Sequence, residues 1–311
     1  MTATSSAPST QASDGALDWA RESHHWPHAQ ASRFIRVGAI DWHVQHFGPP
    51  PDRAPVALLL HGTGASTHSW RDVAPRLAEH CHVVVPDLPG HGFSRRPPGL
   101  ELSLPVMGRA IDALLGALAL SPRLIAGHSA GAVIAAWHVL HGRARPSHLV
   151  GINGAWQPFG GPAAHWISPA TQVLASSTWA AMGLSRLATH ELVLERLLRG
   201  TGSRVDAAGR RGYATLVASP SHVSAALSMM AHWDLRLFQG ELKQYPHKEC
   251  ALTLIVGDAD PMVPASQSQA LSRRIPGAVL HRLPGLGHLA HEEAPDTVAR
   301  LLIGLLSQRT S

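Results

Sequence analysis

Short apolar runs alternate with longer amphipathic stretches along most of the chain. Five runs are continuous rather than alternating in polarity, which is typical of strands buried on both faces of a parallel sheet. They occupy residues 56–61 (VALLLH), 82–86 (HVVVP), 123–127, 148–153 and 252–256 (LTLIV). Helical spacing of apolar residues is found between or after these runs, near 70–79, 104–120, 130–141, 266–274 and 295–306. This alternation predicts an α/β fold, with a mostly parallel central sheet and helices on both faces.

The regular alternation stops after residue 154. Residues 155–245 are helical in composition, and their first part contains no Asp, Glu, Lys or Arg before Arg186. Alternation then resumes and includes a strand at 278–282. We therefore expect a core formed by residues 16–154 and 246–311, opened by a hairpin at 33–37 and 41–47, with an inserted helical cap at 155–245.

The composition fits a globular chain with one large domain. The 311 residues are 45% hydrophobic and 15% charged, so there is enough apolar material for a buried core. Residues 1–15 are rich in Ser, Thr and Ala and lack the apolar segment of a secretory signal, which predicts a disordered tail. No apolar run reaches the ~18 residues of a spanning helix. We expect a cytoplasmic protein and leave contact with a membrane surface open.

Charge, cysteine and glycine patterns exclude several classes of function. The net charge of +5 comes from scattered arginines rather than a basic patch, which argues against nucleic-acid binding. The two cysteines, Cys81 and Cys250, lie far apart, and His24, His25 and His28 have no partner at ligand spacing, so no metal site is expected. The glycine patterns of phosphate and dinucleotide loops are missing, and no cofactor is expected.

The most informative motif is Gly-His-Ser-Ala-Gly at 127–131, which matches G-x-S-x-G. It lies between a predicted strand and a predicted helix, the context in which this motif presents a nucleophilic serine on a sharp turn. Glycines are needed there because larger side chains would collide with the strand or the helix. Ser129 is the candidate nucleophile, and a small-residue turn without chemistry is the alternative.

A serine nucleophile needs a general base and a group that orients the base. His288 follows the last predicted strand and is the candidate base, whereas His61 and His91 lie in turns where histidine ordinarily bonds the backbone. Asp260 closes the strand at 252–256 and is preferred as the orienting acid over Asp258, which is better placed to cap the turn. The resulting order of Ser, Asp and His is the one expected after such a motif.

Two further groups complete the candidate site. The backbone N–H groups of Thr63, in the turn that follows the first buried strand, and of Ala130 could bind a developing oxyanion. Asn153 ends another strand but cannot hold an imidazolium as a carboxylate does. The predicted cap is rich in large apolar side chains that could line a pocket over the serine, or form the cap's own core. Those assigned to the pocket are Trp156, Phe159, Met230 and Trp233.

The motifs taken together resemble the capped α/β-hydrolase superfamily over residues 33–308. The matching segments are HGTG (61–64), DLPGHGFS (87–94), GHSAG (127–131), GDADPMVP (257–264) and GLGH (285–288). At a finer level the chain resembles the BchO-type proteins of photosynthetic bacteria. The segments that carry this likeness are HGTGASTHSWRD (61–72), GHSAGA (127–132), INGAWQPFGG (152–161), ERLLRGTGS (195–203) and SMMAHWDL (228–235).

The resemblance implies an accessory role in the magnesium branch of tetrapyrrole synthesis, which leads to bacteriochlorophyll. A hydrophobic small molecule, such as a tetrapyrrole, and a magnesium-chelatase subunit are then the candidate partners. Three hypotheses about function stay open: a serine hydrolase of this pathway, a binding accessory without turnover, and a general carboxylesterase or carbon-carbon bond hydrolase. Dehalogenase and epoxide-hydrolase chemistry would need a carboxylate at Ser129.

Overall fold

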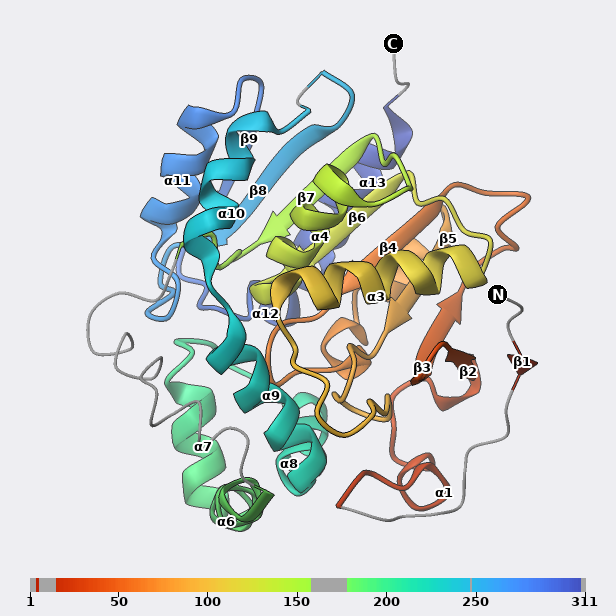
Figure 1. Ribbon diagram of the computed structural model, residues 1–311. Helices are drawn as coiled ribbons and strands as arrows, with labels where there is room; N and C mark the ends of the chain where they lie inside the picture. The colour runs from red at the N-terminus through yellow and green to blue at the C-terminus, as the bar shows by residue number, and fades with distance from the viewer. Residues whose placement is uncertain (1–3, 6–14, 158–177, 247, 309–311) are drawn as a thin grey trace.

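A twisted sheet forms the centre of the computed structural model, which describes residues 4–5, 15–157, 178–246 and 248–308 (Figure 1). In this part of the chain the sheet has nine strands in the order β1-β2-β3-β5-β4-β6-β7-β8-β9. They are β1 Thr4–Ser5, β2 Ser32–Val37, β3 Ile40–Phe47, β4 Val56–Leu60, β5 His82–Pro86, β6 Leu124–His128, β7 His148–Ile152, β8 Ala251–Gly257 and β9 Val279–Leu283. In this order the pairs β1–β2, β2–β3 and β3–β5 are antiparallel, and all pairs from β5–β4 to β8–β9 are parallel. The predicted fold class is confirmed.

The central strands are buried on both faces, as their continuous apolar runs predict. In β4, Leu58 and Leu60 belong to the hydrophobic cluster on one face of the sheet, and Ala57 and Leu59 belong to the cluster on the other. All five residues of the strand are buried. Alternate residues join different clusters because successive side chains of a strand point to opposite faces. Both faces of the sheet must therefore be covered by helices.

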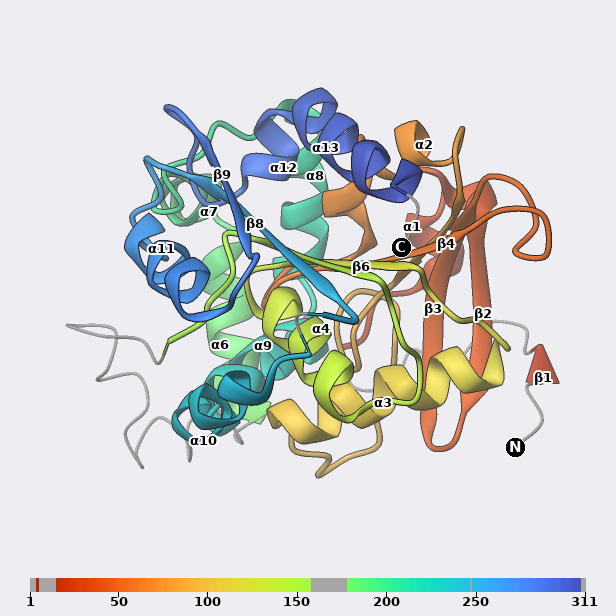
Figure 2. The same ribbon diagram turned by 90° about the horizontal axis from the view of Figure 1, so that it is seen from above.

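Helices cover the two faces in separate layers (Figure 2). The described helices outside the long connection between β7 and β8 are α1 Trp19–Glu22, α2 Ala74–Leu77, α3 Leu104–Ala117, α4 Ala130–His141, α11 Ala265–Arg274, α12 Ala290–Glu293 and α13 Pro295–Ser307, with short 3-10 turns at η1 Ala29–Ala31 and η2 Thr67–Trp70. Side chains of α3, α4 and α11 join the first hydrophobic cluster. Those of α2 and α13 join the second.

Two predicted helices are shorter in the structure. The stretch at 70–79 forms the turn η2 and the one-turn helix α2 instead of one continuous helix. Pro75 occupies the first turn of α2, where its missing N–H costs nothing, but it would break a helix that began at Trp70. The helix predicted at 104–120 ends at Ala117, and Ala119 takes a left-handed backbone conformation. Most of the predicted tail at 1–15 lies outside the described residues.

A group of helices, called the inserted helices below, lies between β7 and β8 in the chain. They are α6 Thr178–Ala188, α7 Glu191–Arg199, α8 Ala207–Val217, α9 Pro220–His232 and α10 Leu235–Glu241, with the turn η4 Leu242–Gln244. Helices α6 to α9 gather at one end of the sheet (Figure 1). Ala225 and Met229 of α9, and Leu235 and Phe238 of α10, are buried in the same cluster as side chains of α3 and α4.

We expect Gly108→Ala to destabilise the protein, although alanine favours a helix more than glycine does. A Cβ at Gly108 would overlap the indole of Trp137, where α3 packs against α4. Overpacking of this kind costs about 1–3 kcal/mol. Gly304→Ala is the matched control, because this exposed position in α13 has open space around it and should gain about 0.5–1 kcal/mol. Urea unfolding of the three proteins checks both signs, and equal stabilities for Gly108→Ala and the parent chain would contradict the packing argument.

Candidate active site

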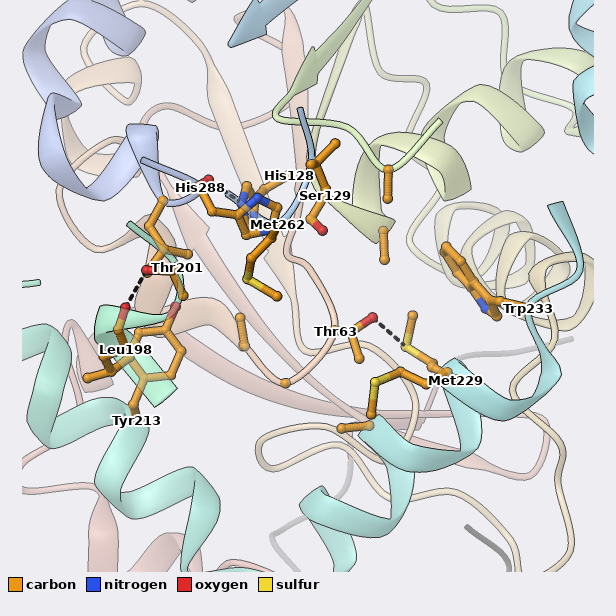
Figure 3. Close-up of a pocket in the computed structure, with 18 of the residues that line it drawn as sticks. Thr63, His128, Ser129, Leu198, Thr201, Tyr213, Met229, Trp233, Met262 and His288 are labelled. Carbon is orange, nitrogen blue, oxygen red and sulfur yellow. Dashed lines mark hydrogen bonds between the residues drawn. The ribbon is translucent and has the colours of Figure 1, made fainter. Parts of the chain in front are cut away.

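Ser129 occupies a strained turn between β6 and α4. Its φ of 51° and ψ of −115° are sparsely populated for a residue with a side chain. The glycines around it allow this turn: a Cβ at Gly127 would overlap the backbone of Gly131, and a Cβ at Gly131 would overlap the carbonyl of Leu60. The Ser129 side chain lines a cavity (Figure 3).

The structure brings Asp260 and His288 into direct contact. They lie in the loops after β8 and β9, and His288 Nδ1 is 2.7 Å from Asp260 Oδ2. The other carboxylate oxygen accepts the N–H groups of Met262 and Val263 at 2.8 and 2.9 Å. Burial alone would raise the pKa of Asp260, but the hydrogen bonds from His288 and the other donors outweigh it and lower that pKa. Asp260 is therefore held as a carboxylate facing the imidazole.

Asp258, the alternative acid, lies elsewhere. Its Oδ1 accepts the N–H of Gly285 at 2.7 Å, and the residue is exposed. It joins the ends of the turns that follow β8 and β9 and makes no contact with His288 in the described part of the chain.

Asn153 has a part in the site that the sequence reasoning did not assign to it. Its Nδ2 donates to Asp260 Oδ2 at 2.8 Å, and its Oδ1 accepts the N–H of Gly257 at 3.3 Å. The residue takes a φ of 45° directly after β7. Its polar side chain at the end of an apolar strand was the available signal, but the contact joins positions far apart in the chain and follows only from the strand order.

Ser129 and His288 line one cavity, without a hydrogen bond between them in the described structure. Figure 3 shows the two side chains on the same wall. Bonds between a nucleophile and its base are often long in a free enzyme and tighten when substrate binds. The missing bond between Ser129 and His288 is therefore compatible with a nucleophile and its base in a free enzyme.

A hydrogen bond to the carbonyl oxygen of Gly62 fixes the orientation of the peptide unit that carries the Thr63 N–H. His61 Nε2 accepts the N–H of Leu88 at 2.9 Å, so the proton lies on Nδ1 and is donated to Gly62 O at 2.8 Å. The C=O and N–H of a trans peptide point in opposite directions, so fixing Gly62 O also fixes the Thr63 N–H. Ala130 begins α4, and the first amides of a helix have no acceptor within it.

His128, next to the serine, is buried and contacts the backbone of the loop that carries His288. Its Nε2 is 2.9 Å from the carbonyl oxygen of His288, to which it can donate. Burial, and then the neighbouring His288, lower the pKa of His128 to about 3. The ring is therefore neutral, and it supports the loop that carries His288.

The cavity is small and mostly apolar. Its volume is about 260 Å³, and its described lining contains no Asp, Glu, Lys or Arg. Met230 and Trp233 line it, as predicted from the sequence (Trp233 is labelled in Figure 3), together with Met229, Leu198 and Leu235 from the inserted helices. Trp156 does not line it: its Nε1 donates to Ser268 Oγ at 3.2 Å in the protein interior. Phe159 lies outside the described residues.

Tyr213 on α8 lines the cavity and joins it to a buried ion pair. Its hydroxyl donates to Glu292 Oε1 at 2.7 Å, and Arg71 donates to Glu292 Oε2 at 2.6 Å. Burial raises the pKa of Glu292, partly offset by Arg71. These contacts tie α8 to the helix that follows His288, and the sequence held no local signal of them.

Neither a metal cluster nor a membrane span is found among the described residues. No group of three or more His, Cys, Asp and Glu side chains could hold a metal ion in that part of the chain. No helix of the same residues is long and apolar enough to cross a membrane.

The chain is similar in sequence to known proteins over most of its length. The model of the alpha/beta hydrolase family matches residues 57–301. The magnesium-chelatase 30 kDa subunit of Rhodobacter capsulatus is 38% identical over 91% of this chain and 96% of its own length. The pimeloyl-[acyl-carrier protein] methyl ester esterase of Vibrio vulnificus is 26% identical over 85% of this chain and 98% of its own.

Solved structures show the same fold. An alpha/beta hydrolase fold protein from Burkholderia ambifaria has a TM-score of 0.69 and 27% identity, with 88% of this chain and 95% of that one covered. The enol-lactonase of Burkholderia xenovorans also gives a TM-score of 0.69, covering 88% of this chain and 100% of its own, at 19% identity, which shows likeness of fold alone.

The buried histidines should make the protein less stable in acid. Burial lowers the pKa of His128 to about 3 and that of His222 to about 4, whereas an unfolded histidine titrates near pH ~6.5. Below that pH the unfolded state binds more protons than the folded one, so the free energy of unfolding decreases. The stabilisation is complete above ~6.5 and decreases as the pH falls toward about 4. Urea unfolding at about pH 8, 6 and 5 measures this, and a flat profile would contradict it.

His291→Phe provides a matched comparison for the acid effect. Both ring nitrogens of His291 lack a hydrogen-bond partner in the described structure, and the ring packs against Trp70. Burial, and then His128, lower the pKa of His291 well below its ordinary value. Because phenylalanine binds no proton, the variant should lose less stability between about pH 8 and 5 than the parent chain. Equal losses would show that His291 does not contribute.

Proposed function

Because the chain belongs to the alpha/beta hydrolase family, and within it is similar to the magnesium-chelatase 30 kDa subunit, we propose that it is a serine hydrolase acting on an ester-type bond in magnesium-tetrapyrrole synthesis. The observation that carries the chemistry is the 2.7 Å contact between Asp260 and His288 beside the strained Ser129 turn. Residues 155–245 would form a cap over this site.

In the proposed mechanism Ser129 Oγ attacks the carbonyl carbon of the ester. His288 Nε2 takes the hydroxyl proton, while Asp260 accepts the Nδ1–H and stabilises the imidazolium. The carbonyl oxygen becomes an oxyanion that accepts the N–H groups of Thr63 and Ala130. The alcohol leaves with the proton from His288, and an acyl group remains on Ser129. A water molecule, deprotonated by His288, then attacks the acyl carbon, and His288 returns this proton to Ser129 Oγ as the carboxylic acid leaves.

The cavity supports an uncharged, apolar substrate group. Its lining offers no cation to a carboxylate, and an unpaired charge would lose its hydration there. Its volume of about 260 Å³ lies just below the range of ligand pockets, which is about 300–1,000 Å³. An ester-bearing arm of a larger hydrophobic molecule fits these dimensions better than a complete tetrapyrrole ring. The macrocycle of such a substrate would remain outside the described cavity.

The likeness to a magnesium-chelatase subunit supports a second candidate function. The chain could bind a porphyrin or a chelatase subunit without turnover. The relative named as a magnesium-chelatase subunit aligns with this chain over 96% of its own length. A third candidate, a general carboxylesterase or carbon-carbon bond hydrolase, is supported by the more distant esterase and by a 2-hydroxy-6-oxo-6-phenylhexa-2,4-dienoate hydrolase of Burkholderia cepacia at 25% identity. The contact between Asp260 and His288 beside Ser129 favours catalysis over binding alone.

Hydrolysis of p-nitrophenyl butyrate tests the chemistry directly. We expect turnover by the parent chain and a loss of about 10³-fold or more in kcat for Ser129→Ala, because the nucleophile is removed while the N–H donors stay in place. Ser272→Ala, a serine of α11 outside the site, should keep the parent rate. Comparable rates for Ser129→Ala and the parent chain would show that Ser129 is not the nucleophile.

A pigment profile of the source organism tests the biological role. We expect deletion of the gene to lower bacteriochlorophyll, and restoration by the wild-type gene but not by Ser129→Ala at matched protein level. Restoration by both would identify a binding accessory and contradict catalysis in this pathway. An unchanged profile after deletion would contradict the pathway assignment and favour a general hydrolase.

A further inference from the structure

Helix α9, one of the inserted helices, contributes a buried histidine to the loop that holds Thr63. His222 is 2% exposed. Its Nε2 lies 3.1 Å from the carbonyl oxygen of Gly64, and its Nδ1 lies 3.1 Å from the backbone nitrogen of Gly92. The ring thus lies between two turns of the core, the one after β4 and the one after β5.

The partners of the ring determine where its proton lies. The Gly92 N–H can only donate, so Nδ1 of His222 is the acceptor and the proton is on Nε2. Nε2–H then donates to Gly64 O. One neutral side chain therefore makes a hydrogen bond of each kind, and both are made to backbone groups.

The bond to Gly64 continues through the backbone to the Thr63 amide. Gly64 O belongs to the same peptide unit as the Ala65 N–H, and that N–H donates to Gly62 O at 3.2 Å. Gly62 O in turn belongs to the peptide unit that carries the Thr63 N–H. Two planar peptide units thus connect His222 with the proposed oxyanion donor.

The loop is supported from two sides, and the two supports differ in origin. His61 holds Gly62 O from within the loop's own segment, next to β4. His222 holds Gly64 O from helix α9, which follows about half of the chain later. The Sδ atom of Met229, on the same helix, lies 4.0 Å from Thr63 Oγ1 (Figure 3). Full support of the loop therefore requires that α9 is packed against it.

We propose that His222 is a positioning residue that couples the packing of α9 to the orientation of the Thr63 N–H. The inference rests on the proposed function, since the Thr63 amide matters for rate only if it binds an oxyanion. Substrates would contact the inserted helices, and His222 would transmit the packing of α9 to the reacting centre. The inserted helices would thereby complete the site as well as line it.

Two conservative variants separate the two hydrogen bonds of His222. In His222→Gln the terminal amide reaches the position of Nε2 and can still donate to Gly64 O. In His222→Asn the side-chain oxygen replaces Nδ1 and can accept from Gly92, but the chain is too short to reach Gly64. We expect His222→Asn and His222→Ala to lower kcat for p-nitrophenyl butyrate about 10-fold with KM changed less than about 2-fold, and His222→Gln to retain most of kcat.

Ser185→Ala is the control for lost stability of the inserted helices. Ser185 is 2% exposed, and its hydroxyl donates to Val217 O at 2.7 Å within these helices, away from the loop. Its kcat should equal that of the parent chain. Equal kcat losses in His222→Gln and His222→Asn, or an equal loss in Ser185→Ala, would overturn the inference and leave only a structural role.

Amide hydrogen exchange of the segment 61–66 tests the same coupling without turnover. Exchange should be faster in His222→Ala and His222→Asn than in the parent chain, and unchanged in His222→Gln and Ser185→Ala. If the parent chain hydrolyses no ester, the proposed function fails and the exchange pattern alone decides whether His222 holds the loop. If the parent is active and His222→Ala has the parent kcat and exchange, the inference fails and the proposed function stands.

Discussion

The close packing of the Ser129 turn against β4 determines where every other group of the site can be. Gly131 lies so near the carbonyl of Leu60 that no side chain fits between them, and the Ser129 N–H donates to Ile152 O at 2.9 Å. The ends of β4, β6 and β7 are thereby held together. Backbone strain of the kind seen at Ser129 costs of order 1–3 kcal/mol and persists only where the surroundings determine it. Here three strand ends do so.

Neutral imidazoles provide several of the cross-links between the loops around this turn. The chain has 22 His but only 15% charged residues. His61 and His222 each accept one backbone N–H and donate to one backbone carbonyl. A neutral ring can make both bonds without the cost of burying a charge. Asp87 is a buried carboxylate in the same region: burial alone would raise its pKa, but His43 and its other donors lower it to about 2.

The sequence predicts the central sheet well because its signal is local. A run such as VALLLH is apolar throughout, and only a strand buried on both faces of a sheet needs that pattern. Helix boundaries near Pro75 and Ala119 were less predictable, because they depend on single residues within otherwise helical spacing. Ser129, Asp260 and His288 could be named as candidates because each lies next to a strand end in a short motif. The contacts of Asn153 and His222 join distant segments, so no local pattern contains them.

The core and the inserted helices contribute different chemistry to the cavity. The groups proposed to react or to bind charge, at Ser129, His288 and Thr63, come from loops of the core. The inserted helices contribute mainly apolar walls, in which methionine side chains adapt to different shapes. Such a wall excludes water and strengthens the electrostatic effect of the N–H donors. Such a wall can also adapt to substrates of different shape while the loops of the core stay in place. Tyr213 and His222 are the polar side chains of α8 and α9 that limit this freedom, because they bond to the core beside the reacting groups.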